Sequence, residues 1–412
     1  MNNAAALDLN SQCYCWPVKR ESITDAISKE APAEDMAQML SERLNYFAST
    51  SIFLSPDILR SMTDQVKAIE GVIKLPAYAQ AAMKRAEGTA FSPQQPQTPG
   101  AFMGYDFHIT EEGPRLIEIN SNAGGAFIVN MIETAIGRPS ETFNVDVASM
   151  FQAEWMSAGR SRPLRSIAIV DDQPAQQYHY PDMCLAKTLL EKQGLTVIIT
   201  DPADLRLEDG KLYHGATAID LVYNRLTDFD LQAPQSEIVK RAYLKDAAVV
   251  TPAPHHHALY ADKRNLILLS DQDRLAAFGA SQSQLNALQS IPSTEDVTPE
   301  KADRLWGNRR QLFFKPQGGF GSRGAFRGAK LTKKVWGEIL EGGYIAQELI
   351  APPMRAVTVD SEEIALKFDV RVYTYAGSPL LWAARIYQGQ TTNLRTPGGG
   401  LAAIIPVETP NC

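Results

Sequence analysis

Two carboxylates and an amide occur close together in the segment GYDFHITEEGPRLIEIN, at Asp106, Glu118 and Asn120. Its two alternating runs, joined by a Gly–Pro turn, predict a β-hairpin. Asp106 and Glu118 are equidistant from Glu112, so a symmetric hairpin sets them opposite each other with Asn120 on the same face. Facing carboxylates repel unless a cation lies between them. Mg²⁺ takes oxygen ligands of this kind, so the hairpin predicts a magnesium site, with a solvated sheet face as the alternative.

A glycine-rich segment, FFKPQGGFGSRGAF, contains Lys315 and the three glycines Gly319, Gly321 and Gly324. This glycine spacing alone is weak evidence for dinucleotide binding, because the strand-like AFRGAKL follows where a helix is needed. A Walker loop would need Gly-Lys-Ser/Thr, which is missing. A glycine-rich loop between two strands can instead cover phosphates with its backbone N–H groups while the lysine adds positive charge. An ordinary mobile hairpin is the alternative.

The closing segment carries three arginines, Arg371, Arg385 and Arg395, together with Asn393. FDVRVYTY and LLWAARIYQ flank the turn AGSP and predict a second hairpin over 368–388. The fixed fork of a guanidinium suits phosphoryl and carboxylate oxygens, so these residues are candidates for an oxyanion site. Three arginines on a solvated face are the alternative.

The elements that must hold these residues predict an α/β protein. SPDILRSMTDQVKAIEGVI opens with Ser and Pro start signals and predicts a helix over 55–73. Strands and helices alternate between 161 and 260, which predicts a small parallel sheet. Ligands of such sheets bind beyond the carboxyl ends of the strands. The residues after its third strand, Asn224, Arg225 and Asp228, are therefore candidate substrate residues, with a simple loop contact as the alternative.

Composition limits the class of protein. The 412 residues are 44% hydrophobic and 21% charged, as in ordinary globular proteins, and the net charge of −7 argues against general nucleic-acid binding. No apolar run is long enough to cross a membrane, and no secretion signal is evident at the N-terminus. The four cysteines, Cys13, Cys15, Cys184 and Cys412, are too few for a disulfide framework. We therefore expect a cytoplasmic protein with no nucleic-acid or membrane partner.

Taken together, these segments resemble the ATP-grasp superfamily, whose members activate a carboxylate as an acyl phosphate and join it to a nucleophile. ADKRN resembles the Asp-Lys that opens the nucleotide-binding module, and this implies Lys263 as the first ATP lysine. The glycine-rich segment, with Ser322, resembles the loop that covers the phosphates and implies Lys315 as the second. YIAQELI resembles the adenine hinge, which implies contacts from Gln347, Glu348 and Leu349.

The remaining motifs resemble bacterial glutathione synthetases and ribosomal-protein glutamate ligases. The second hairpin and NLRTPGGG match their arginine strands and Asn-rich loop, and the first hairpin matches their metal strands. The Glu-x-Asn strand usually comes last but here precedes the others, so the chain looks circularly permuted. The resemblance covers about two-thirds of the chain and implies four parts. Residues 1–160 contain the metal strands, and residues 161–260 form an α/β substrate domain. Residues 261–350 contain the glycine loop and the hinge, and residues 351–412 contain the arginine strands.

The resemblance implies an ATP- and Mg²⁺-dependent carboxylate–amine ligase acting on amino acids or short peptides, with Mn²⁺ as an alternative ion. Arg371, Arg385 and Arg395, with Asn393, would stabilise the transferring phosphoryl group and the tetrahedral intermediate. No general base is identifiable. A small-molecule kinase and an ATP-binding regulatory protein without turnover are the alternatives. The identity of the acid and the amine, and whether the protein is a homodimer, are left open.

Overall fold

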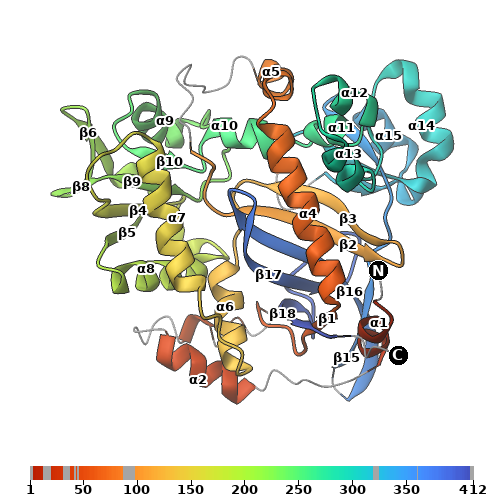
Figure 1. Ribbon diagram of the computed structural model, residues 1–412, viewed down its shortest axis with the longest axis horizontal. Coiled ribbons are helices and arrows are strands. Elements are labelled where there is room, and N and C mark those ends of the chain that lie inside the picture. The colour runs from red at the N-terminus through yellow and green to blue at the C-terminus, as the bar shows by residue number, and fades with distance from the viewer. Residues whose placement is uncertain are drawn as a thin grey trace.

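The computed structural model describes residues 3–12, 20–30, 38–40, 43, 46–86, 98–318, 324–359 and 361–408. Figure 1 shows a central sheet with a smaller α/β unit beside the yellow and green helices and a third unit of green, cyan and blue elements at the opposite end. Cys13, Cys15 and Cys412 lie outside the described residues. Within the described ranges, no helix combines the length and apolarity that a membrane span requires.

The central sheet has seven strands in the order β1-β18-β17-β16-β2-β3, with β15 paired to β16. The strands are β1 (Ile52–Leu54), β2 (Met103–Thr110), β3 (Gly113–Asn120), β15 (Met354–Val359), β16 (Glu362–Tyr375), β17 (Ser378–Tyr387) and β18 (Gly400–Pro406). Both predicted hairpins, β2–β3 and β16–β17, therefore belong to one sheet, although some 250 residues of chain separate them. Arg371 of β16 lies opposite Asp106 of β2 in this pairing.

Each face of the central sheet packs against helices, because side chains along its strands alternate in direction. One face carries Tyr105, Val370 and Ile386 and packs against α4 (Pro56–Ile73), which crosses the sheet in Figure 1. The predicted helix over 55–73 is thus confirmed, with the hydroxyl of Ser55 accepting from the N–H of Ile58. The other face packs against α6 (Ala126–Ala135) and α7 (Phe143–Ser157) and also carries the charged residues described below.

The predicted small parallel sheet is confirmed and has the order β10-β9-β4-β5. Its strands are buried on both sides, as expected where helices cover a parallel sheet. A three-stranded antiparallel sheet, β6-β7-β8, was not expected from the sequence. This unit consists of β4 (Ser166–Val170), α8 (Tyr180–Lys192), β5 (Thr196–Thr200), β6 (Leu205–Glu208), β7 (Lys211–His214), β8 (Thr217–Ile219), β9 (Leu221–Asn224), α9 (Glu237–Leu244) and β10 (Val249–Thr251).

A third sheet, of order β11-β14-β12-β13, is antiparallel and lies at one end of the central sheet. Phe314 and Ala346, on its inner side, pack against Trp336 of α15. Its strands are β11 (Thr294–Asp296), β12 (Leu312–Pro316), β13 (Phe326–Arg327) and β14 (Tyr344–Glu348). The helices α14 (Ala302–Asn308) and α15 (Lys333–Leu340) pack against it, and α11 (Asn265–Leu269) contacts β11. Further helices are α5 (Pro76–Lys84), α10 (Pro254–His256), α12 (Gln272–Ala277) and α13 (Gln282–Leu288), of which α13 contacts α4.

The first and last described elements lie together. Ala6 of α1 (Ala4–Ser11) packs with Phe53 of β1 and Ile405 of β18, and β1 pairs in parallel with β18. Arg355, which is 1% exposed, donates to the carbonyl oxygens of Leu9 (3.1 Å) and Gln12 (2.8 Å) at the end of α1. A further helix near the N-terminus, α2 (Arg20–Glu30), packs against α6.

Candidate active site

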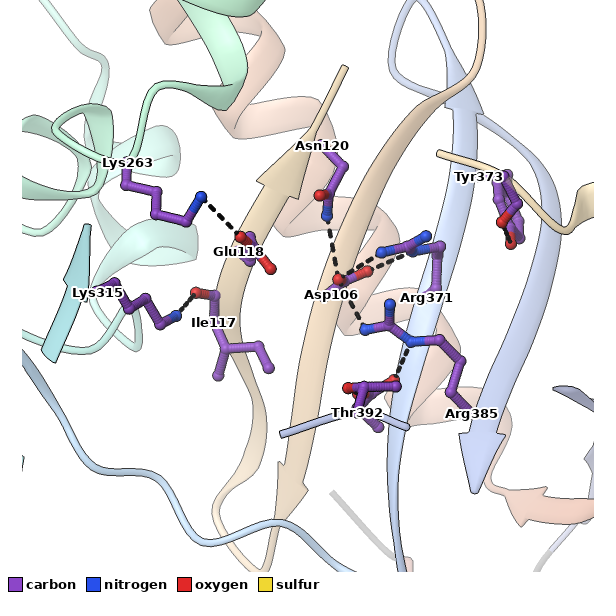
Figure 2. A network of polar contacts seen from close by, with 12 residues as sticks. Asp106, Ile117, Glu118, Asn120, Lys263, Lys315, Arg371, Tyr373, Arg385 and Thr392 are labelled. Atoms are coloured by element: carbon purple, nitrogen blue, oxygen red, sulfur yellow. Dashed lines mark hydrogen bonds and ion pairs between the residues drawn. The ribbon is translucent and has the colours of Figure 1, made fainter. Parts of the chain in front are cut away.

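A row of charged side chains crosses four strands of the central sheet, on the face opposite α4. Glu118 lies across from Asp106, Asp106 across from Arg371, and Asp369 across from Arg385. Because these are directly paired positions, their side chains project from one face within reach of one another. Figure 2 shows the row from Lys263 and Lys315 on one side to Tyr373 on the other.

The predicted pairing of Asp106 with Glu118 is present, but the hairpin is not symmetric about Glu112. Thr110 pairs with Gly113, so the turn contains two residues, and a β-bulge between Asp106 and Phe107 shifts the register by one. Ile117 is the extra residue, and its carbonyl oxygen accepts from Lys315 Nζ at 2.7 Å. Bulges redirect side chains and backbone groups in this way near functional sites. The bulge therefore sets the carboxylate pair and adds an acceptor for the lysine.

Asp106 is fully buried and accepts four hydrogen bonds from three residues. Arg371 donates from Nε (2.6 Å) and Nη2 (2.7 Å), Arg385 from Nη2 (2.8 Å), and Asn120 from Nδ2 (3.1 Å). Burial raises the pKa of Asp106, but the two guanidiniums outweigh burial and hold its pKa at about 2. Arg385 also donates to Asp369 (2.6 Å). Asp106 is therefore an ionised anchor for two arginines.

The expected repulsion between Asp106 and Glu118 is thus relieved by cations of the protein itself. Lys263 Nζ lies 3.2 Å from Glu118, and although burial raises the pKa of Glu118, Lys263 and Lys315 lower it below its ordinary value. The oxygens of Glu118 and Asn120 fit a hard cation. Asp106 fits as a third ligand only if a guanidinium moves away from it. No group of three or more His, Cys, Asp or Glu suited to a metal occurs in the described part of the chain.

A cavity of about 240 Å³ lies between the antiparallel β12–β14 sheet and the arginine strands. Among the described residues of its wall, cations outnumber carboxylates, which are those of Glu118 and Glu348. The cations in the wall are Lys263, Lys315, Arg327, Lys330, Lys367 and Arg385. Such a wall favours a polyanion, and phosphate oxygens match both lysine and arginine donors.

Lys315 lies deep in this cavity. Its Nζ donates to Gln347 Oε1 (2.8 Å) as well as to the bulge carbonyl, and burial lowers its pKa to about 8. Among the described residues, Gln347 Nε2 and His108 Nε2 are both buried in the cavity wall without a hydrogen-bond partner. The carbonyl of Ile350 binds Nδ1 of His108 (2.8 Å), so a neutral ring leaves Nε2 as an acceptor. One unused donor and one unused acceptor fit the edge of a nucleobase.

The predicted hinge residues Gln347, Glu348 and Leu349 all line the cavity. The backbone N–H of Leu349 donates to the carbonyl of Gln311 (2.8 Å), and that of Glu348 donates to Ser293 (2.8 Å). The N–H groups of Glu348 and Leu349 are therefore already bonded within the protein, and the contact of these hinge residues with adenine stays a prediction. Of the glycine loop, Gly319, Gly321 and Ser322 lie outside the described residues, and Gly324 adopts a positive φ of 71° beside Tyr344.

The four predicted catalytic residues separate into two groups. Arg371 and Arg385 meet at Asp106, whereas the Arg395 guanidinium lies over the Tyr178 ring, 5.3 Å from its centroid, and does not line the cavity. Asn393 accepts from the N–H of Arg395 (3.0 Å) with its side chain, so it stabilises its own turn. Of the three arginines, two therefore contact Asp106, and the predicted catalytic role of Arg395 beside them stays a prediction.

Two of the three predicted substrate residues, Asn224 and Asp228, form hydrogen bonds with backbone groups of the protein. Asn224 donates to the carbonyl of Pro252 (3.0 Å), and Asp228 accepts from the N–H groups of Gln232 and Ala233. The side chain of Arg225 instead reaches the loop after β3, where Nη1 donates to Asn122 Oδ1 (2.5 Å). Only Arg225 therefore extends toward the charged row.

Sequence reasoning missed several polar residues near the row. Arg327, Lys330 and Lys367 carried no motif, and Asp369 was overlooked although it stands two residues before Arg371. Asp369 accepts from Arg385 and from Thr392 Oγ1 (2.7 Å), which ties the Asn-rich loop to the arginine strands. Its spacing from Arg371 on a predicted strand is the signal that could have identified it.

The comparisons with known proteins bear on the fold. No family model matches the chain. A glutathione synthetase-like effector, GSS30, from Globodera pallida has 11% sequence identity and a TM-score of 0.54 over 88% of this chain and 90% of that one. The chain has the fold of this glutathione synthetase-like protein. The predicted glutathione synthetase-like architecture is therefore confirmed at the level of the fold.

Two further similarities are weaker. The ATP-grasp ligase PsnB, complexed with minimal precursor, Mg and ADP, has 15% identity and a TM-score of 0.32 over 58% of this chain and 87% of that one. In sequence, 229 residues are 24% identical to "Putative glutamate--cysteine ligase 2-3" of Frankia alni, a match that covers 52% of this chain. The match spans only 25% of the length of that relative.

Proposed function

We propose that this protein is an ATP-dependent carboxylate–amine ligase that forms an amide bond through an acyl phosphate. The observation that carries this proposal is the cation-lined cavity, which contains the buried Lys315 and ends at Arg385 of the charged row. A polyanion in the cavity would present its terminal phosphate to the arginines, where an attacking carboxylate would also be attracted. The glutathione synthetase-like fold agrees with this reading.

In this proposal ATP lies in the cavity with its phosphates at Lys263 and Lys315, while Gln347 and His108 border the base. Glu118 and Asn120 would hold Mg²⁺, and Asp106 would join them only by exchanging a guanidinium for the ion. Bound Mg²⁺ supplies charge neutralisation for the phosphate oxygens. Mn²⁺, with similar oxygen ligands, is a second ion for the same residues.

Arg371 and Arg385 would act by preorganised charge. The substrate carboxylate attacks the γ-phosphorus of ATP, forming an acyl phosphate and releasing ADP. An amine then adds to the acyl carbon, loses a proton and expels inorganic phosphate, leaving an amide. Two guanidiniums held by Asp106 and Asp369 need no rearrangement to stabilise the charge that develops on oxygen.

The substrates are proposed to be amino acids or short peptides. The support is the fold shared with a glutathione synthetase-like effector and the partial sequence match to a relative named as a glutamate–cysteine ligase. The circular permutation is also a proposal, supported by the contact of α1 and β1 with β18.

An ATP-binding protein without turnover is the second candidate. The observation that favours it is the engagement of both Asp106 oxygens by Arg371, Arg385 and Asn120, which leaves the carboxylate unavailable to an ion. Such a protein would bind nucleotide and be stabilised by it, yet would release no ADP.

Incubation of the protein with ATP, Mg²⁺ and a pooled amino-acid and peptide library, followed by mass spectrometry, tests these candidates. A ligase yields ADP, phosphate and a product lighter than its two substrates by one water. A phosphorylated product without an amide would indicate a kinase. Thermal stabilisation by ATP without any product would indicate the second candidate.

A further inference from the structure

A cluster of aromatic rings and guanidiniums lies where the parallel-sheet unit meets the Asn-rich loop. The rings of Tyr46 and Tyr178 are stacked 4.8 Å apart at 13°, and His179 is 5.5 Å from Tyr178. Arg43 and Arg395 lie 5.8 Å and 5.3 Å from the Tyr178 centroid. These five residues, together with Arg225, are called the tyrosine–arginine cluster below. Its members come from four separate stretches of the chain.

Of the three arginines of the cluster, Arg225 lies within range of the charges of Asp182 and Asp171. Arg43 donates to the carbonyl of Tyr178 (2.6 Å), and Arg225, only 5% exposed, donates to Asn122 and to the hydroxyl of Tyr223 (3.3 Å). Within the described ranges, none of the three forms an ion pair with Asp or Glu. The guanidiniums of Arg43 and Arg395 therefore favour an anion from outside the chain.

His179 gives the cluster a polar ring that carries no charge. It shares a hydrogen bond with the hydroxyl of Tyr46 through Nδ1, and burial, followed by the charge of Arg225, lowers its pKa to about 3. A neutral imidazole can bind a polar group without a further positive charge. Gly124 packs closely against two members of the cluster, because a Cβ at this position would be 2.5 Å from Arg225 Nη2 and 3.4 Å from His179.

The cluster is directly connected to the charged row. The hydroxyl of Tyr373 donates to the carbonyl of Gly124 (2.7 Å), and the guanidinium of Arg371 lies 5.9 Å from the Tyr373 ring. Figure 2 shows Tyr373 on the side of Arg371 that is away from Lys263 and Lys315. The cluster therefore borders the charged row on the side away from Lys263 and Lys315.

We propose that Arg395, Arg225 and Arg43, with the His179 ring, form a binding subsite for a carboxylate of the substrate that does not react. The proposal rests on the proposed ligase function and specifies its substrate class, namely molecules with a carboxylate in addition to the reacting group. Arg395 is then a substrate-recognition residue, while Arg371 and Arg385 serve the phosphoryl group. The carboxylate belongs either to the acid or to the amine, since both present the same oxygens to the guanidiniums.

Calorimetric titration of the full chain, with acetate, succinate, methylamine and glycine as probes, tests the subsite without turnover. Succinate binding at least about tenfold tighter than acetate assigns the subsite to the acid, and glycine tighter than methylamine assigns it to the amine. Either result supports the subsite. Equal affinities within each pair would overturn it.

Arg395 is the residue to change because it is exposed, so its loss leaves the core intact. Arg395→Gln should weaken the preferred probe by about tenfold or more, and Arg395→Lys should recover part of that loss. Arg206→Gln is the matched control, since Arg206 lies over Tyr213 at 4.9 Å in the distant β6–β8 sheet. Unchanged probe affinity in Arg395→Gln would refute the proposal.

ATP affinity, measured in the same variants, separates the two proposals. If ATP binds normally and succinate and glycine show no preference, the subsite is wrong and the ligase proposal stands. If the wild-type protein fails to bind ATP while the carboxylate preference is present, the ligase proposal is wrong and the subsite belongs to another activity.

Discussion

The cation-lined cavity and the tyrosine–arginine cluster both collect positive charge, but they balance it differently. At the inner end of the cavity, Lys263 is paired with Glu118, and Arg385 with Asp106 and Asp369. In the cluster, the guanidiniums contact backbone carbonyls, amide oxygens and aromatic rings. The inner end of the cavity holds its cations with internal anions, whereas the cluster leaves the charges of Arg43 and Arg395 available to a ligand.

This difference has a physical consequence. Removing one partner of a buried ion pair costs free energy, because the other charge stays desolvated without a partner. A ligand phosphate must therefore compete with Glu118 for the lysines, whereas a ligand carboxylate at Arg395 displaces only water. The four predictions that follow test this contrast, from the largest expected effect to the smallest.

Arg385→Gln and Arg395→Gln should differ sharply in stability. Loss of Arg385 leaves Asp106 and Asp369 each short of a partner, so we expect a loss of about 3–5 kcal/mol. Arg395 forms no ion pair with a described carboxylate, so its loss leaves no described anion without a partner. We expect this loss to change the free energy of unfolding by less than about 0.5 kcal/mol. Urea denaturation measures both. Similar losses for the two variants would break the comparison.

Glu118→Gln removes the anion that balances Lys263 while keeping the shape of the side chain. ADP release from ATP should fall by about a hundredfold or more, because charge placed for the transition state is lost. The fold should remain intact, and nucleotide without Mg²⁺ should bind somewhat more tightly, since Lys263 no longer has a competing carboxylate. Wild-type turnover under saturating Mg²⁺ and substrates would refute the role of Glu118.

Lys315→Met should weaken ATP binding by about 10- to 100-fold and adenosine binding much less, because only ATP carries the charge that Lys315 meets. Equal losses for ATP and adenosine would mean that the lysine only supports the fold. Arg206→Gln, far from the cavity, should leave both affinities unchanged.

The pKa of Lys315 adds a pH dependence to this prediction. Because burial lowers the pKa to about 8, the free protein loses this charge as pH rises through 8, and ATP affinity should decline there. The unfolded chain keeps the proton to a higher pH, so wild-type stability should rise relative to Lys315→Met between pH 8 and about 10.4. A flat difference across this range would contradict the burial of a charged lysine.

A permuted chain should have the smallest effect. Joining residue 408 to residue 3 through a short glycine–serine linker and opening the chain between 160 and 161 keeps every strand pairing of the central sheet. Because both regions depend on the sheet and not on the chain order, ATP affinity and the carboxylate preference should stay within about threefold of wild type. Calorimetry of the folded permutant measures both. If ATP affinity were lost and the carboxylate preference kept, or the reverse, the two regions would depend on different chain connections.

The fold could be predicted where a local pattern was strong. The alternating hairpin around Asp106, the capped helix over 55–73 and the parallel strands of the α/β unit all have local signals. The strand β18 was missed because GLAAIIP is a short apolar run after a glycine-rich loop, and its burial on both sides follows from partners far away in the chain. The edge strand β1 was missed for the same reason.

The sequence predicted which residues lie at the site better than it predicted which of them contact one another. Lys263, Lys315, Gln347 and Arg385 do meet in one cavity. Arg395 was grouped with Arg371 by residue type, but the Asn-rich loop carries it to Tyr178 instead. Nothing in the local sequence around Tyr178 indicates this contact, because it depends on how a loop and a separate α/β unit pack.

The sequence by itself determined which segments form the strands of the charged row, because strand periodicity and a hairpin are local properties. That Asp106 and Glu118 lie opposite each other depends in addition on the β-bulge at Ile117, which the sequence did not predict. Only the tertiary structure decided which charge neutralises which. Arg371 and Arg385 reach Asp106 through pairings across more than 260 residues of chain, and the register of those pairings sets every distance in the row. Electrostatic energies depend on these distances and on burial, so the balance of charge, and with it the division of labour between the two regions, arises when the sheet is assembled.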